Sequence, residues 1–241
     1  PWAGSLRDYL LGVKIVNGHG KCLRFGGQVM KNVAGYDVSR LMAGSLGTLG
    51  VIMEVSFKVL PKPASELTIE IECEQDQAIR RVARWAGKPL PLSGAAWDAG
   101  RLSLRLSGAR SETAAAAETL GSATVRHDPD FWRDLREHRL EFFDSDAPLW
   151  RISLPAHIAP LDLPGDCLLD WGGAQRWYSG SASAEAVRSA ADDAGGHATL
   201  FRGEIAGAAR FPPLPTPLQA LNDRVRHAFD PLGLFNGATG A

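Results

Sequence analysis

The fold of this chain is decided by Gly44-Ser45-Leu46-Gly47-Thr48-Leu49-Gly50-Val51-Ile52, in which glycine recurs every third residue immediately before an alternating apolar run. That run, Val51–Leu60, predicts a half-buried strand that ends at Pro61-Lys62-Pro63. Glycine lets a backbone approach a ligand closely, and turned N–H groups can face phosphate or ring acceptors. The stretch therefore permits a phosphate or flavin cradle, although a tight helix-to-strand connection would use the same residues.

A nicotinamide site is not indicated by these glycines. The G-x-G-x-x-G fingerprint of a dinucleotide fold follows a strand and opens a helix, whereas these glycines precede a strand. Upstream, Leu10–Val16 and Cys22–Phe25 flank Asn17-Gly18-His19-Gly20, a pattern that predicts a hairpin. Apolar residues within Asp37–Ala43 predict a short helix that is stopped by Gly44.

Beyond Pro63 the patterns follow one another in the order strand, helix, two strands, helix, and a second, less regular series follows. They predict an α+β domain with one antiparallel sheet backed by helices. The expected helices are Gln75–Ala86, Ser111–Leu120 with Ser111 as its N-cap, Asp130–Phe143, Ser183–Ala194 and Pro217–Phe229. The expected strands are Leu67–Cys73, Leu92–Trp97, Leu102–Leu106, Trp150–Leu154, Cys167–Trp171 and Arg176–Ser179.

Composition narrows the classes of function. Lys and Arg number 26 against 27 Asp and Glu, and a net charge of -1 gives no general attraction for nucleic acid or anionic lipid. No apolar stretch approaches the roughly 20 residues that span a bilayer, so no direct membrane insertion is expected. The cysteines, Cys22, Cys73 and Cys167, lie far apart, without metal or disulfide spacing. We therefore expect a cytoplasmic protein with no metal site and no nucleic-acid partner.

A family resemblance rests on the run from Lys31 to Pro63. It resembles the FAD-binding fold shared by vanillyl-alcohol oxidase and the D-2-hydroxyacid dehydrogenases, in which K-N-x-x-G-Y-D-x-x-x-L-x-x-G-S-x-G-T-L-G-V-I leads into K-x-x-P-x-P. More narrowly, the chain is similar to the FAD-binding E subunits of bacterial glycolate oxidases in five collinear motifs. These motifs are Gly4–Gly12, Phe25–Lys31, Trp150–Pro155, Asp170–Gly173 and Gly195–Thr199.

The resemblance implies a domain organisation. We expect residues 1–63 to be the C-terminal part of a PCMH-type FAD-binding domain, 64–210 an α+β cap domain, and 211–241 a helix and tail that return to the FAD domain. The family's pyrophosphate loop precedes the residues where this sequence starts. The beginning of the FAD-binding domain is therefore expected to lie outside this sequence, and the chain alone is expected to hold no FAD.

The resemblance also implies cofactor contacts by matched position. Asp230–Asn236 resembles the family's D-P-x-G-x-F-N, but the Pro-Gly-Arg that normally follows is replaced by Gly237-Ala238-Thr239, which leaves the last contact open. The implied FAD-binding residues are Gly4, Ser5, Gly44, Ser45, Gly47, Thr48, Leu49, Gly50, Val51, Ile52 and Asn236.

Three residues of the cap motifs are the candidates for catalysis. Oxidation of a 2-hydroxy acid needs a proton acceptor and a cation for the carboxylate. His197 is the first choice for a base or substrate ligand, Arg151 could clamp a carboxylate, and Asp170 could line the pocket beside Trp171. Each also has a structural interpretation: His197 as a packed histidine, Arg151 as an ion-paired or solvated strand residue, and Asp170 as a turn residue.

The implied function is that of an FAD-dependent 2-hydroxy-acid oxidoreductase subunit, which oxidises glycolate to glyoxylate. We expect a paralogous flavin subunit and an iron–sulfur subunit as partners, with any membrane attachment made through them. The cap lacks the histidine and glutamate metal cluster found in other members of the superfamily. His127 and His138 flank a helix of charged and aromatic residues, which is interpreted as a solvated amphipathic face, and no function is assigned to them. The alternative is therefore a non-catalytic structural or assembly subunit with a vestigial flavin site, in which case the chemistry belongs to the paralogue.

Overall fold

The computed structural model describes residues 2–28, 36–121, 124–126 and 129–237. They form two compact units: unit 1 comprises Pro1–Trp2 and Lys62–Pro212, and unit 2 comprises Ala3–Pro61 and Pro213–Ala241. The Lys31–Gly35 part of the sequence motif and His127 lie outside the described residues.

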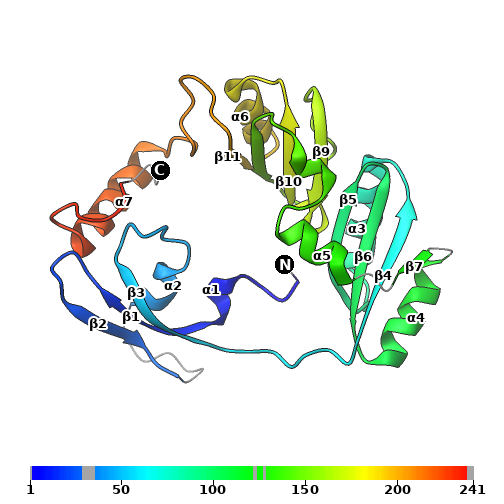
Figure 1. Ribbon diagram of the computed structural model, residues 1–241, viewed down its shortest axis with the longest axis horizontal. Coiled ribbons are helices and arrows are strands. Elements are labelled where there is room, and N and C mark those ends of the chain that lie inside the picture. Colours follow the sequence, from blue (N-terminus) through cyan, green and yellow to red (C-terminus); the bar gives the residue numbers. More distant parts are fainter. Residues whose placement is uncertain (1, 29–35, 122–123, 127–128, 238–241) are drawn as a thin grey trace. The chain divides into compact units, whose positions relative to one another are not determined.

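Unit 2 is a small sheet packed against helices. Its antiparallel strands are in the order β2-β1-β3, and the chain's last helix, α7, packs on this unit (Figure 1). The core is formed by Leu10, Val13, Ile15, Met42 and Leu49, with Val225 and Phe229 of α7 packed against it. The elements are α1 (Leu6–Tyr9), β1 (Leu10–Val16), β2 (Cys22–Gly26), α2 (Val38–Met42), β3 (Val51–Phe57) and α7 (Thr216–Phe229).

The predicted hairpin is confirmed as β1 and β2. Asn17 forms its turn by accepting hydrogen bonds from the N–H groups of His19 (3.1 Å) and Lys21 (3.0 Å) through Oδ1. The N–H group of Gly18 donates to the carbonyl of Phe229 at the end of α7, at 2.9 Å. The hairpin turn is therefore anchored to the C-terminal helix.

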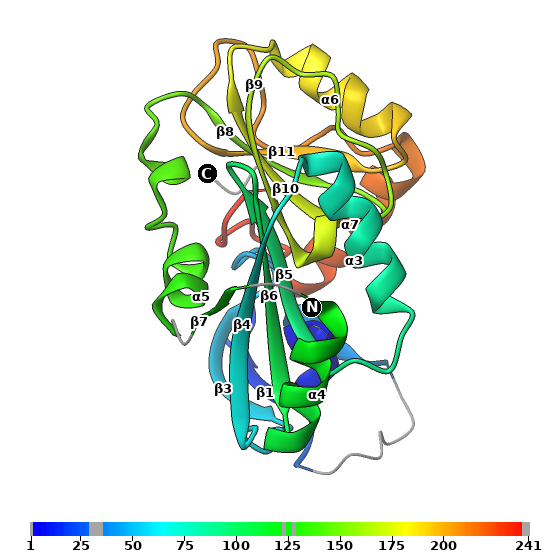
Figure 2. The ribbon, with the colours of Figure 1, turned by 90° about the vertical axis from the view of Figure 1, so that its right-hand side faces the viewer.

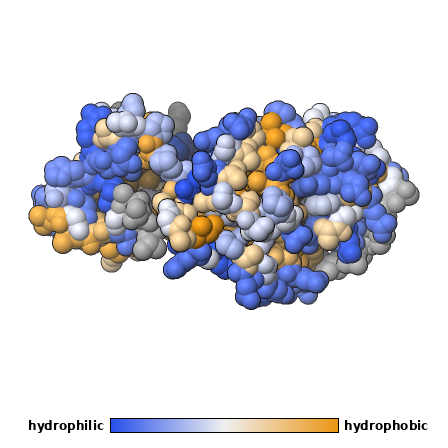
Figure 3. Space-filling model, turned by 90° about the horizontal axis from the view of Figure 1, so that it is seen from above, coloured by the Kyte–Doolittle hydropathy of each residue, from blue (hydrophilic) through white to orange (hydrophobic). Residues whose placement is uncertain are grey.

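The prediction of a half-buried strand at Val51–Leu60 is wrong in two respects. The strand ends at Phe57, and its apolar side chains are exposed, with Val51 at 51% and Met53 at 62%. The physical reason is that no described part of the core of unit 2 covers these side chains, since that core cluster contains no residue of β3. Figure 3 shows that hydrophobic residues, in orange, reach the surface of the molecule.

Unit 1 contains one antiparallel sheet of eight strands in the order β11-β8-β10-β9-β5-β6-β4-β7, which confirms the predicted α+β class. Its strands are β4 (Ser65–Glu72), β5 (Leu92–Asp98), β6 (Arg101–Gly108), β7 (Thr124–Arg126), β8 (Leu149–Ser153), β9 (Gly165–Asp170), β10 (Gln175–Gly180) and β11 (His197–Arg202). Its helices are α3 (Gln75–Ala86), α4 (Arg110–Leu120), α5 (Pro129–Arg136) and α6 (Ala184–Asp193), with 3-10 turns η1 (Glu141–Asp144) and η2 (Trp171–Gly173).

The two faces of the large sheet have different covers. Helices α3 and α6 lie on one face, and α5 lies on the other (Figure 2). On the α5 face, Phe143 packs with Leu149, Leu168 and Trp177, and Trp132 donates to the hydroxyl of Thr68 at 2.9 Å. This cover leaves a polar stretch of the same face, which carries the candidate catalytic residues.

The long helix expected over Asp130–Phe143 is broken. It ends at Arg136, and His138 adopts a left-handed backbone conformation with φ 55°. The imidazole stacks on Phe143 with ring centroids 4.3 Å apart and meets Trp177 edge-on at 4.5 Å. His138 is therefore a packed residue and not part of a solvated face. Its ring contacts hold the turn that ends the helix.

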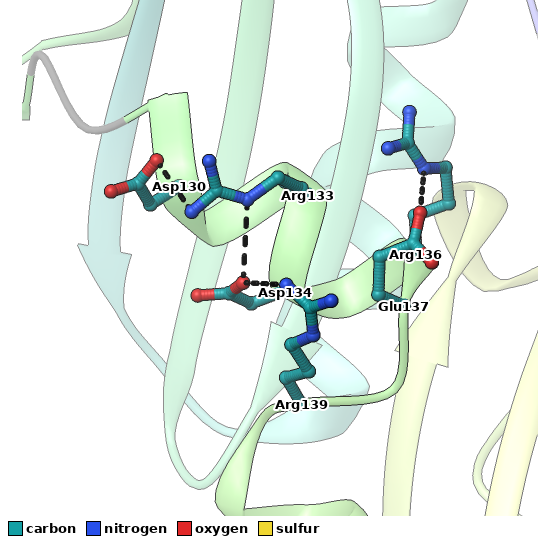
Figure 4. Close-up of polar contacts among 6 residues, drawn as sticks. All are labelled: Asp130, Arg133, Asp134, Arg136, Glu137 and Arg139. Atoms are coloured by element: carbon teal, nitrogen blue, oxygen red, sulfur yellow. Dashed lines mark hydrogen bonds and ion pairs between the residues drawn. The ribbon is translucent and has the colours of Figure 1, made fainter.

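The charged face of α5 does match the expected solvated surface. Asp130 pairs with Arg133 at 2.9 Å, and Asp134 lies 3.7 Å from Arg133 and 4.0 Å from Arg139 (Figure 4). Exposed pairs of this kind contribute little to stability, typically below about 1 kcal/mol each.

The start of α4 also differs from the prediction. Ser111 lies inside the first turn, and Ala109 occupies the N-cap position. The carboxylate of Glu112 accepts from the N–H group of Ala109 at 3.0 Å, so this acidic side chain satisfies the N–H group of the N-cap residue itself, as in one half of a capping box.

Candidate functional site

The predicted flavin cradle is an exposed loop of unit 2 with a left-handed backbone at several positions, which we call the glycine loop (residues 44–50). Positive φ occurs at Gly44 (82°), Leu46 (53°), Gly47 (74°) and Gly50 (153°). The N–H group of Thr48 donates to the carbonyl of Ser45 at 2.9 Å, which closes the turn. No hydrogen bond of the N–H groups of Leu46 and Gly47 is found within the described residues.

The C-terminal loop holds this turn. The side-chain amide of Asn236 donates to the carbonyl of Leu46 at 2.8 Å. A Cβ added to Gly47 would lie 2.9 Å from Nδ2 of Asn236 and would displace this amide, and the φ of 74° also favours glycine. Sequence reasoning placed Asn236 among the cofactor contacts, and the structure joins it to the loop that carries most of them.

The glycine loop fits the phosphate or ring acceptors of a flavin nucleotide. A Cβ added to Gly44 would meet no described atom within 4 Å, so a ligand has room to approach this backbone. Gly44, Leu46 and Gly47 are exposed, whereas the side chain of Leu49 is buried in the core of unit 2 and leaves only its backbone available. Turned, exposed N–H groups are suited to anionic or ring acceptors.

The remaining predicted cofactor residues lie on two other elements, β3 and the start of α1. Val51 and Ile52 expose their side chains at the start of β3. Gly4 has φ 104°, and Ser5 is the N-cap of α1, where its hydroxyl and N–H group donate to the carboxylate of Asp8 at 2.8 and 2.9 Å. These two bonds hold the pKa of Asp8 below its usual value. Ser5 therefore already serves a capping function.

Two of the predicted catalytic residues, His197 and Asp170, lie in a row of polar residues across four strands of unit 1. We call it the polar row: His197, Ser153, Gln175 and Asp170. His197 of β11 pairs with Ser153 of β8, Ser153 pairs with Gln175 of β10, and Gln175 pairs with Asp170 of β9. Directly paired residues point to the same face of a sheet, so the four side chains share one face. His197 is exposed and Gln175 is buried.

Arg151 belongs to the same face as the polar row. It precedes Ser153 by two residues in β8 and pairs with Thr199 of β11. His197 and Arg151 are thus diagonal neighbours on adjacent strands, with a Cα separation of roughly 7–8 Å that long side chains can bridge. The structure brings together the two residues that the sequence assigned to a base and a carboxylate clamp.

Asp170 is not part of this pair. It lies three strands from His197, a distance of roughly 14 Å at the usual strand spacing. Its carboxylate accepts from the N–H group of Trp171 at 2.7 Å and from the amide of Gln175 at 3.3 Å. Burial raises the pKa of Asp170, although these hydrogen bonds act against the increase. The geometry favours the turn function that sequence reasoning had left open.

The turn that Asp170 supports is unusual in its backbone. Trp171 has φ 52° with 49% of its surface exposed, and Gly172 and Gly173 follow with φ 68° and 96°. A Cβ on Gly172 would lie 3.0 Å from the ring of Trp2 and 3.1 Å from Val82, so the turn is closely packed. The two glycines thus serve the packing of unit 1.

Ser153 and Gln175 were not identified from the sequence as site residues. The sequence could have indicated Ser153, because it stands two residues after Arg151 and must share its face in a strand. Gln175 could not be placed in the row without the register of β10, which the sequence does not give. The described residues contain no group of three or more metal-binding side chains, and they include no helix long and apolar enough to cross a bilayer.

The chain is similar to curated oxidoreductase subunits. It is 47% identical to glycolate oxidase subunit GlcE of Escherichia coli (strain K12) over 236 residues, which are 98% of this chain and 66% of GlcE. A shorter match, 46% identity over 66 residues, joins 27% of this chain to 14% of glycolate oxidase subunit GlcD of Bacillus subtilis (strain 168). The chain thus spans just under two thirds of GlcE. No protein-family model matches it.

Solved structures share the fold at low identity. The 4-ethylphenol oxidase from Gulosibacter chungangensis matches 97% of this chain and 66% of its own with a TM-score of 0.57 and 13% identity. p-Cresol methylhydroxylase matches 96% of this chain and 65% of its own with a TM-score of 0.53 and 14% identity. These likenesses concern the fold alone, and they confirm the expected PCMH-type architecture.

Proposed function

From the premise that this chain has a PCMH-type fold and is a relative of the glycolate oxidase E subunit, we propose that it is the flavin-binding part of a glycolate-oxidising subunit. What supports the proposal is the similarity along 98% of the chain together with the exposed glycine loop. In this proposal, glycolate is converted to glyoxylate, and electrons pass to an iron–sulfur partner. A GlcD-like subunit is the second partner, and the complex is cytoplasmic, with any membrane attachment made through partners.

The residues of this chain have separate tasks in the proposal. Backbone N–H groups of the glycine loop hold FAD, which when bound supplies the two-electron acceptor for the reaction. Val51 and Ile52 offer apolar contact beside the loop. Gly4 and Ser5 contribute backbone at the start of α1.

The cap supplies the substrate contacts. Arg151 holds the carboxylate of a 2-hydroxy acid through its planar guanidinium. His197, diagonal to it, would accept the proton of the substrate hydroxyl at an imidazole nitrogen. Ser153, which pairs with His197 and lies two residues from Arg151 on the same face, can donate a hydrogen bond to the substrate. Asp170 keeps the turn at Trp171 in place.

Flavin content tests the proposal. The whole gene product, purified together with its partner subunits, is expected to contain one FAD per copy of this subunit, and anaerobic glycolate should bleach it. Matched samples would receive acetate, which has the carboxylate but no hydroxyl. FAD that stays oxidised with glycolate would support the alternative, a structural or assembly subunit with a vestigial flavin site. Absence of bound FAD would contradict both the cofactor and the reaction.

A further inference from the structure

The geometry of unit 2 points to a function for Asn236 that differs from direct cofactor contact. We propose that Asn236 is a positioning residue that fixes the glycine loop in the conformation needed for FAD, an inference that rests on the proposed function. Its side chain donates to the carbonyl of Leu46 at 2.8 Å. Leu46 is left-handed, a conformation that a branched apolar residue adopts only when its surroundings impose it.

Asn236 is itself held on the other side. Its carbonyl accepts from the guanidinium of Arg226 in α7 at 3.3 Å. The carboxylate of Asp230 accepts from the N–H groups of Leu234 at 3.0 Å and Phe235 at 2.8 Å, which shapes the turn just before Asn236. Burial opposes ionisation of this carboxyl, but the backbone hydrogen bonds prevail and lower its pKa. A charged Asp230 thus keeps the turn closed.

The same loop is tied to α7 through the core. Leu49 is buried with Met42, and Val225 and Phe229 of α7 pack against this cluster. Leu49 anchors one end of the glycine loop and Asn236 anchors its exposed middle, so the two contacts together restrict the loop. Without the hydrogen bond from Asn236 to Leu46, the turn at Leu46 and Gly47 would lose the described contact that holds it from outside the loop.

Hydrogen exchange on the flavin-free whole gene product tests the positioning function without any catalysis. Asn236→Ala should speed amide exchange at Ser45 and Thr48, whose N–H groups are hydrogen-bonded at 3.2 and 2.9 Å, by about fivefold, the effect of losing one hydrogen bond. Exchange in β1 should not change. FAD affinity, measured by fluorescence titration, should weaken by a similar factor of about five. The matched control is Asn222→Ala in α7, which makes the same chemical change away from the loop and should alter neither quantity.

A second variant addresses the case in which Asn236→Ala fails to fold. Gly47→Ala leaves Asn236 intact but puts a Cβ 2.9 Å from its Nδ2, and it should produce the same local increase in exchange. Weaker FAD binding with unchanged exchange would overturn the inference, because Asn236 would then be a direct ligand. Faster exchange with unaltered FAD affinity would overturn it as well.

The outcomes also separate this inference from the proposed function. If the unmodified protein binds no FAD, the proposed function fails. Amide exchange in the glycine loop that still increases in Asn236→Ala and Gly47→Ala would then support the positioning function of Asn236 alone. Amide exchange in the glycine loop that is unchanged in both variants would contradict the positioning function of Asn236, whether or not the protein binds FAD.

Discussion

His197 pairs with Ser153 across β11 and β8, and this register places its imidazole on the same sheet face as Arg151, one diagonal step away. The five collinear motifs gave no distance between these two residues. Their proximity follows from antiparallel pairing, because two strands that are remote in sequence bring the Gly195–Thr199 motif beside the Trp150–Pro155 motif. In the proposed function, His197 as base and Arg151 as carboxylate clamp would act at this spacing on a substrate as small as glycolate.

His197→Ala should lower turnover of glycolate at least tenfold, which corresponds to about 1.4 kcal/mol of transition-state stabilisation. The flavin content should not change, since the imidazole is not assigned to cofactor binding. Steady-state kinetics with parallel flavin determination would measure both. His157→Ala, at an exposed histidine of the loop after β8, is the matched control and should behave as the unmodified protein. Equal turnover in the two variants would make His197 a structural residue.

Arg151→Ala should raise KM for glycolate by roughly tenfold or more, because a charge-assisted contact to the carboxylate is lost. Arg151→Lys should give a smaller increase, since lysine keeps the charge but not the planar pair of donors. Arg80→Ala, in an exposed pair on α3, serves as the control. An unchanged KM in Arg151→Ala would indicate that the guanidinium does not contact substrate.

Stability of unit 1 should fall as the pH decreases below neutral, because His138 is packed in its neutral form. Burial, followed by repulsion from Arg202, lowers its pKa despite the opposing charge of Glu137. The unfolded chain therefore binds the proton more readily, so the contribution is complete above about pH 6.5 and is lost as the pH falls toward the lower folded-state pKa. Thermal unfolding across this range should show a shallower pH slope for His138→Asn, which tolerates positive φ. Identical slopes would contradict the prediction.

Gly18→Ala should destabilise unit 2 by roughly 1–3 kcal/mol, the usual cost of overpacking. The added Cβ would lie 2.4 Å from Oδ1 and 2.7 Å from Cα of Asp230, and part of this obstruction is backbone. Gly27→Ala is the control, because no described atom lies within 4 Å of its Cβ position. Denaturant unfolding of both variants would measure the difference in stability, and equal midpoints would rule out the close contact between Gly18 and Asp230, the residue that follows α7.

The sequence predicted much of the fold because its patterns were local. The hairpin turn at Asn17, the helix Gln75–Ala86 and the strands around Gly100 each depend on a few neighbouring residues. The break at His138 could not be predicted in this way, since it depends on Trp177 and Phe201, which come from distant strands. Exposure of Val51 was missed for a related reason, because strand alternation does not reveal whether a neighbour covers the strand.

In the candidate site, too, local motifs could be predicted and contacts between distant residues could not. Motifs identified His197, Arg151 and Asp170, but only strand register separated the first two from the third. The sequence also did not reveal that Asn236 bonds to Leu46, because 190 residues separate them. Strand β11, which positions His197, was not predicted either, since its short run follows a helix stop at Gly195-Gly196 and carries a polar residue at Thr199.

The most direct test of the central claim is a single-turnover measurement of flavin reduction in this subunit. The complex would be mixed anaerobically with glycolate, and loss of the oxidised flavin absorbance would be followed for the unmodified subunit and for His197→Ala. A second preparation, in which the flavin of the GlcD-like partner has been removed, would isolate the signal of this subunit. The account predicts rapid reduction that slows at least tenfold in His197→Ala. Flavin of this subunit that remains oxidised, while the partner's flavin is reduced normally, would contradict it.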